Sequence, residues 1–235
     1  MSTILGGRRG NPYPHRYREK VEEILSEEEF LTYLENAVKL ENERRHKKDN
    51  PTCLAHTRIK TVKISGLLAL IHYLGLRISE IVGDRPHKYF TKEGEERWTQ
   101  EVHGLRKQDI RITKNMIRIE PKEIRKHGKR NEPLWIPIDL PGANYIVEQW
   151  ELKENKNDRL FPISTWTAWS LISQITEGRL YPHYFRLNRA TKFANQEETS
   201  IKDLQEWFGW RSMQTIEKYM GKAGRVTRRM ARRLV

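Results

Sequence analysis

The chain has a single cysteine, Cys53, and this scarcity excludes internal disulfides and every cysteine-rich zinc site. It lacks an apolar run long enough to cross a membrane, and its N-terminal segment has no apolar stretch of the signal-peptide kind. Its eight histidines show no metal-ligand pair spacing. We therefore expect an intracellular protein that needs neither a membrane, a metal ion nor a cofactor.

Negative charge is also scarce, because 44 Lys and Arg residues face only 31 Asp and Glu residues, for a net charge of +13. The excess is uneven. Residues 1–50 hold ten basic and ten acidic side chains, whereas the last fourteen residues hold six basic and no acidic ones. A folded basic chain with few cysteines has nucleic acid as its expected polyanionic partner. The alternative is the charged, solubilising surface of a heat-adapted protein, although such surfaces are usually near neutral overall.

The apolar pattern predicts a mainly α fold with a small antiparallel β-sheet, an α+β class. A capping box at Ser26 to Glu29 opens the first helix, and a second helix over about 56–74 ends at Gly75. Residues 83–101 are polar and expected to be irregular. Strand-like runs follow at about 102–105, 116–120 and 134–138, and helices at 142–153, 165–177, 182–195, 200–207 and from 212 to the end. The absence of a β-α-β alternation argues against a parallel sheet.

The segment Gly75-Leu-Arg-Ile-Ser-Glu80 places Arg77 on a turn just after a predicted helix. A guanidinium on a rigid turn can bind a phosphate through two parallel hydrogen bonds, with Glu80 fixing its orientation. The alternative is an Arg77–Glu80 surface ion pair worth less than about 1 kcal/mol. Taken alone, the segment favours the surface pair.

A second pattern, Pro182-His-Tyr-Phe-Arg186, predicts a helix start with two basic side chains on one face. Proline suits the first helical position, so His183 falls in the first turn and Arg186 one turn later. The free N–H groups and the dipole at a helix N-terminus favour a bound anion. The alternative is a capping histidine with a solvated arginine, which a lone pattern of this kind favours.

The third pattern runs from Phe208 to Tyr219. Gly209 permits a turn between a helix capped at Ser200 and a helix that carries Tyr219. Two readings fit this segment: a helix-turn-helix that recognises DNA, and an ordinary helical hairpin with Trp210 in its core.

In this order, the three patterns resemble the catalytic domain of tyrosine recombinases, the phage-type and Xer-like integrases. The resemblance spans about 24–235, includes a lysine on a β-hairpin, and places a tyrosine nine residues after the tryptophan. It assigns six catalytic residues: Arg77, Lys122, His183, Arg186, Trp210 and Tyr219. Residues 83–101 are an insertion relative to the family, and the neighbouring Lys126 and Lys129 leave the choice of lysine open.

The resemblance implies a specific division of labour. Tyr219 attacks the phosphodiester, Arg77 and Arg186 clamp the non-bridging oxygens, and Lys122 protonates the leaving 5′-oxygen. His183 assists removal of the phenolic proton or holds the phosphate, and the indole donates one hydrogen bond to it. These charges stand in place of a metal ion, and re-ligation by the reverse reaction needs no ATP.

The implied function is that of a site-specific recombinase or integrase that cleaves and rejoins double-stranded DNA through a 3′-phosphotyrosyl intermediate. The resemblance further implies a homodimer or tetramer on DNA and a cytoplasmic, nucleoid-associated location. We expect a flexible basic lead over 1–23, a catalytic domain over 24–235 with a basic tail at 221–235 exchanged between protomers, and no separate core-binding domain. Three alternatives stay open: a non-cleaving DNA-binding module, a helix-turn-helix regulator built on 200–220, and a type IB topoisomerase.

Overall fold

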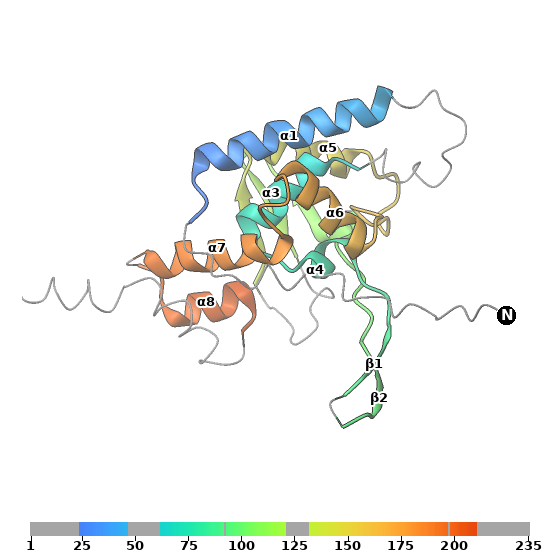
Figure 1. Cartoon of the computed structure of the whole chain (residues 1–235). Helices are drawn as coiled ribbons and strands as arrows, with labels where there is room; N and C mark the ends of the chain where they lie inside the picture. Colours follow the sequence, from blue (N-terminus) through green and yellow to red (C-terminus); the bar gives the residue numbers. More distant parts are fainter. Residues whose placement is uncertain (1–23, 47–61, 92, 121–131, 197, 211–235) are drawn as a thin grey trace, which may run out of the picture.

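The computed structural model describes residues 24–46, 62–91, 93–120, 132–196 and 198–210, which form a mainly helical fold with two small antiparallel sheets (Figure 1). The α+β class is confirmed. The predicted lead, the residues from 211 onward and the loop with Lys122 lie outside the described residues. The helices are α1 (Glu27–His46), α3 (Ile64–Leu74), α4 (Ile78–Val82), α5 (Ala143–Glu151), α6 (Thr165–Ile175), α7 (Pro182–Asn195) and α8 (Ile201–Phe208).

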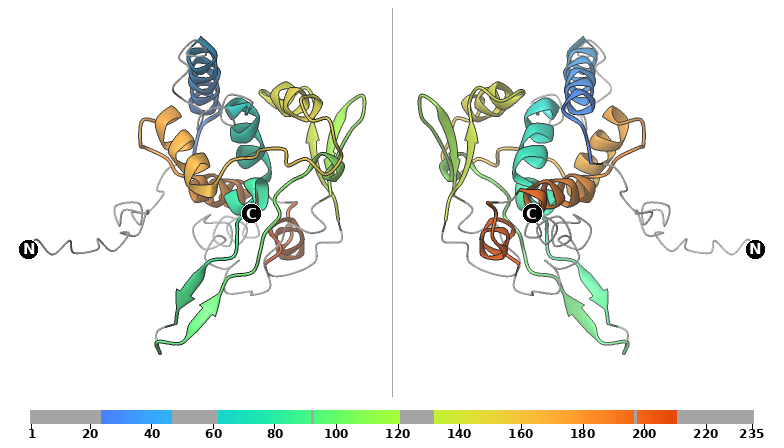
Figure 2. Two further views of the ribbon diagram at one scale, coloured as in Figure 1. Left: turned by 90° about the vertical axis from the view of Figure 1, so that its right-hand side faces the viewer. Right: turned by 90° about the vertical axis from the view of Figure 1, so that its left-hand side faces the viewer.

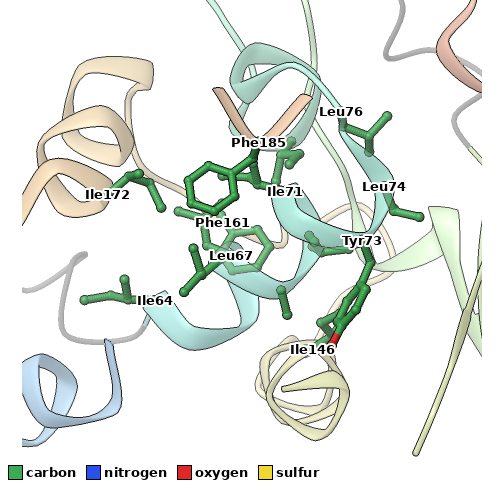
Figure 3. Packing of buried hydrophobic residues seen from close by; sticks show 14 of the residues in the cluster. Ile64, Leu67, Ile71, Tyr73, Leu74, Leu76, Ile146, Phe161, Ile172 and Phe185 are labelled. Atoms are coloured by element: carbon green, nitrogen blue, oxygen red, sulfur yellow. The ribbon is translucent and has the colours of Figure 1, made fainter. Parts of the chain in front are cut away.

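Helix α3 forms the centre of the described fold. Every one of its residues is buried, and it packs against α1, α5 and α7. A helix that is apolar on all sides is typical of such a position, and each fully buried Leu or Ile contributes about 1.5–3 kcal/mol. Figure 3 shows Ile71 of α3 next to Phe185 of α7, and Tyr73 next to Ile146 of α5. The helix begins at Ile64 instead of near residue 56, because the backbone at Lys63 is extended.

The predicted caps of α1 and α8 are confirmed. The backbone N–H of Ser26 donates to the carboxylate of Glu29 at 3.0 Å, and the N–H of Glu29 donates back to the serine hydroxyl at 3.1 Å. Ser200 and Asp203 form the same reciprocal pair at the start of α8, at 2.6 and 3.1 Å. These bonds satisfy N–H groups that have no partner within a helix, so the two starts are fixed by local sequence.

A three-stranded antiparallel sheet joins β3 (Ile110–Ile112), β4 (Met116–Ile119) and β5 (Leu134–Pro137) in that order. The alternation in β4 is confirmed, because Ile117 and Ile119 are fully buried while Met116 and Arg118 are only partly buried. The prediction of a strand near 102–105 is wrong, since the first strand of this sheet begins at Ile110. Residues 107–109 instead form a 3₁₀ turn, η4 (Lys107–Asp109), which precedes that strand.

The stretch expected to be irregular, 83–101, contains a second sheet. It is a hairpin of β1 (Lys88–Phe90) and β2 (Glu96–Trp98), and all six strand residues are exposed. Its strands are three residues long and bury no face, so no apolar alternation marks them in the sequence. The hairpin extends away from the helices in every view (Figure 2).

The C-terminal helices have the predicted order and nearly the predicted bounds. Helices α5, α6 and α7 begin within one residue of the expected starts, and α8 extends one residue beyond its expected end. The helices expected from 212 onward lie outside the described residues. Among the described helices, none is both long and apolar enough to cross a membrane.

Candidate active site

The turn that follows α3 positions Arg77. Gly75 ends α3 with a φ of +59°, which a side chain would disfavour, and its N–H donates to the carbonyl of Ile71 at 3.0 Å. The backbone N–H and Nη1 of Arg77 donate to the two carboxylate oxygens of Glu80, at 2.8 and 2.9 Å. The side chain of Arg77 is 35% exposed and that of Glu80 only 1%. The expected Arg77–Glu80 ion pair is present, but it is not an ordinary surface pair, because a buried carboxylate anchors a partly exposed guanidinium.

Arg186 joins the three sequence patterns in space. Its side chain in α7 is almost fully buried, so the alternative of a solvated arginine is also wrong. Its Nη1 donates to the carbonyl of Gly75 at 2.7 Å, and its Nη2 donates to the carbonyl of Phe208 at 2.8 Å. Its Nη1 also lies 3.9 Å from a carboxylate oxygen of Glu80. One guanidinium thus connects the Arg77 turn, α7 and the C-terminus of α8.

Trp210 lies against this guanidinium. Its ring stacks on Phe208 with a centroid separation of 4.6 Å, and the guanidinium carbon of Arg186 lies 5.0 and 5.6 Å from the Phe208 and Trp210 centroids. Gly209 ends α8 in the left-handed conformation, and the N–H of Trp210 donates to the carbonyl of Gln205 at 3.1 Å. The Gly209-Trp210 turn therefore packs beside Arg186, and Trp210 is only 9% exposed.

His183 lies in the first turn of α7, exposed and one turn before Arg186. Its pKa is lowered from the usual 6.5, first by desolvation from the surrounding protein and then by the positive charges of Arg186 and Arg77. The ring is therefore neutral at pH 7, and one of its nitrogens can accept a proton. The same positive surroundings that oppose a charge on His183 favour an anion at this place.

Two further side chains bind the backbone at the end of α3, and neither belongs to the patterns that the sequence predicted. Arg189 donates from Nε to the carbonyl of His72 at 2.9 Å, and Trp207 donates from Nε1 to the carbonyl of Leu74 at 3.0 Å. Arg189 is one turn after Arg186 on α7, so its helical spacing was a usable signal. Nothing local marks Trp207, because its partner is a backbone group far away in the sequence.

Two of the six residues assigned by resemblance, Lys122 and Tyr219, lie outside the described residues. Lys122 falls in the sequence between β4 and β5, which pair as an antiparallel hairpin, so the expected element type is present around it. Within the part of the chain that the structure describes, no three His, Cys, Asp or Glu side chains come together as a metal site. The structure therefore brings together Arg77, His183, Arg186 and Trp210.

Comparison with known proteins identifies the family. Residues 99–224, more than half of the chain, match the model of the Phage integrase family, and the chain belongs to that family. The predicted resemblance to tyrosine recombinases is confirmed. Arg77 precedes the matched segment, whereas the other five assigned residues fall within it.

The crystal structure of XerA recombinase is similar to this chain with a TM-score of 0.49 and 16% sequence identity, over 83% of this chain and 59% of that one. This chain thus spans less than two thirds of the length of that recombinase. No curated protein matches the sequence.

Proposed function

We propose that this protein is a site-specific DNA recombinase or integrase that cleaves and rejoins double-stranded DNA through a 3′-phosphotyrosyl bond on Tyr219. Family membership supports a recombinase, and one structural observation carries the assignment of the site. That observation is the convergence of the Arg77 turn, the start of α7 and the Gly209-Trp210 turn around the buried guanidinium of Arg186. Three patterns that are individually common are brought together at one place.

The charges of the site suit a phosphodiester undergoing attack. In the transition state the non-bridging oxygens gain negative charge, and donors placed beforehand stabilise that charge. Arg77 offers the accessible guanidinium, held in place by Glu80. Arg186 is the second positive charge of the clamp. Because it is buried, its electrostatic attraction for the phosphate is screened less than it would be in water. The surroundings of His183 support this assignment. Its pKa is lowered first by desolvation and then by the positive charges of Arg186 and Arg77, so two cationic side chains act at the place where the phosphate would bind.

Proton transfer completes the proposed reaction. The phenol of Tyr219 has an ordinary pKa of about 10, so it must lose its proton as it attacks phosphorus. Neutral His183 accepts that proton or orients the phosphate, and Lys122 gives a proton to the leaving 5′-oxygen. The phosphorus–tyrosine bond keeps the energy of the broken phosphodiester, so a 5′-hydroxyl can reverse the step without ATP.

A non-cleaving DNA-binding module is the second candidate, and the burial of Arg186 favours it. At 1% exposure, with two hydrogen bonds to backbone carbonyls, this arginine also has a structural role that needs no phosphate. Such a module would bind DNA as the recombinase does, but Tyr219 would be dispensable for its activity.

A nicked suicide duplex, which traps the covalent intermediate because a short cleaved strand diffuses away, tests the proposal. We expect a covalent protein–DNA adduct, formed equally well in the presence of EDTA. Binding without an adduct on duplexes that carry the target site would favour the module. Relaxation of supercoiled DNA without exchange between two sites would instead indicate a type IB topoisomerase.

A further inference from the structure

The β1–β2 hairpin carries an exposed aromatic surface. Phe90 is 66%, Trp98 64% and Tyr89 43% exposed, and these are three of the eight large hydrophobic side chains that are exposed among the described residues. Phe90 and Trp98 lie on one face, because the cross-strand pairs Lys88 with Trp98 and Phe90 with Glu96 both project from it. An isolated two-stranded hairpin is marginally stable in water, so this aromatic surface indicates that a partner covers it.

The base of the hairpin is fixed to the body of the fold. Asp84 and Val102 exchange two backbone hydrogen bonds of 2.7 and 2.9 Å where the strands leave the body. Gly104 has a φ of +74°, and a Cβ there would lie only 2.4 Å from the backbone nitrogen of Gly83. The hairpin follows α4 directly, so its direction is set next to the candidate active site (Figures 1 and 2).

The charges of the hairpin favour a protein partner over DNA. Residues 84–102 contain four basic and five acidic side chains, a net charge of −1 in a chain of net charge +13. Lys88 forms an ion pair with Glu96, and Arg97 forms one with Glu95 at 2.7 Å. Contact with phosphates would break these pairs and bring the acidic side chains close to negative charge. Exposed aromatic side chains are instead enriched at protein interfaces.

We propose that residues 84–102 form a docking arm that packs the aromatic face of Phe90 and Trp98 against a second copy of this chain. Charge complementarity selects this partner. The arm is slightly acidic and the rest of the chain carries the whole positive excess, so the arm of one copy meets a basic surface on the next. The inference rests on the proposed function in one respect, namely that strand exchange brings copies together on DNA.

Photo-cross-linking tests the occupant of the arm directly. Phe90 is replaced by the photoreactive amino acid benzoylphenylalanine in the full-length chain, which is irradiated while bound to a duplex long enough for two copies. The matched control carries the same amino acid in place of Trp166, which lies in the first turn of α6 and is 63% exposed. We expect a covalent dimer of the chain from position 90, at a yield at least about tenfold above that from position 166. Adducts with DNA alone, or no excess of dimer over the control, would overturn the proposal.

A substitution experiment measures the energetic contribution of the aromatic face. The double variant Phe90→Ser, Trp98→Ser should bind the first copy to DNA as the wild type does, but bind the second at least about tenfold more weakly, as expected for aromatic interface anchors. Trp166→Ser should change neither step. An unchanged second step in a folded double variant contradicts the docking arm.

The cross-link separates failure of the arm from failure of the recombinase assignment. It needs no cleavage, so the Tyr219→Phe chain should give the same dimer yield. A dimer without any cleavage by the wild type would reject the recombinase and keep the arm, whereas cleavage without the dimer would reject the arm alone.

Discussion

Arg186 donates from Nη1 to the carbonyl oxygen of Gly75 at 2.7 Å, which ties α7 to the left-handed residue just before the Arg77 turn. Its second hydrogen bond, to the carbonyl of Phe208, extends the same tie to α8. The placement of the accessible arginine therefore depends on a buried one. This relationship predicts different consequences for the same substitution at the two positions.

Arg186→Lys should destabilise the fold. A single ammonium cannot reproduce the planar fork, so at least one of the carbonyls of Gly75 and Phe208 loses its donor in a buried place. We expect the free energy of unfolding to fall by about 1–3 kcal/mol. Denaturant unfolding measures it, and a change within error would show that the two hydrogen bonds contribute nothing net.

Arg77→Lys should leave the fold nearly unchanged and still impair cleavage. The lysine keeps the positive charge beside Glu80 at a partly exposed position, so we expect less than about 1 kcal/mol of lost stability. The lost phosphate contact should slow cleavage on the order of 10²-fold. Arg111→Lys, at another exposed arginine that is paired with a glutamate, is the matched control. Equal cleavage rates for the two variants would remove Arg77 from the site.

The free energy of unfolding should decrease as the pH is lowered, and His72 should account for part of that decrease. The imidazole ring is buried and stacks on the ring of Phe30, with the two ring centroids 3.8 Å apart. Its Nδ1 has no hydrogen-bond partner among the described residues. Desolvation first, and then the charges of Arg189 and Lys192, lower its pKa to about 2. As the pH falls, His72 is protonated near pH 6.5 in the unfolded chain but only near pH 2 in the folded chain. The neutral, buried His72 therefore gives its full contribution to stability above pH 6.5, and that contribution is lost as the pH falls from 6.5 toward 2.

The measurement is the unfolding free energy of the wild type and of His72→Phe between pH 7 and pH 4. We expect the wild type to lose about 1.4 kcal/mol per pH unit more than the variant below pH 6. Parallel pH profiles for the two chains would contradict a neutral, buried His72.

The local sequence predicted those parts of the fold that local interactions determine. The reciprocal caps at Ser26 and Ser200, the glycine end of α3 and the alternation in β4 each involve residues a few positions apart, and the structure confirms all of them. The β1–β2 hairpin was not predicted, because its short strands bury nothing and have no apolar period. The strand at 110–112 was placed too early, near Leu105, whose burial comes from packing and not from a sheet.

In the candidate site, too, the features set by neighbouring residues were predictable, whereas those set by distant residues were not. The turn carrying Arg77 and the helix start at His183 follow from glycine, proline and spacing, and both are where the sequence placed them. The burial of Arg186 was not predictable in this way. An arginine is rarely buried, and the carbonyls that hold this one belong to residues 111 and 22 positions away.

DNA binding should be strongly dependent on salt. The net charge of +13 is the motivating observation, since basic side chains that neutralise phosphates release bound counterions. If about six phosphates are contacted, the logarithm of the binding constant should fall against the logarithm of the salt concentration with a slope near −5. Fluorescence anisotropy titrations at several salt concentrations give this slope, and a flat response would contradict an electrostatic mode of binding.

In the proposed mechanism, Tyr219 carries the covalent bond to DNA. Tyr219→Phe removes one hydroxyl and keeps the ring, so the fold and the DNA affinity should barely change. Tyr181→Phe is the matched control. Tyr181 lies two residues before His183 in the sequence, just before α7 begins, and is therefore an alternative candidate for the nucleophile.

The most direct measurement is mass-spectrometric mapping of the wild-type adduct trapped on a nicked duplex, together with adduct yields for both variants. We expect DNA on the peptide that contains Tyr219, full adduct yield from Tyr181→Phe and none from Tyr219→Phe. DNA mapped to another residue, or an adduct formed by Tyr219→Phe, would contradict it.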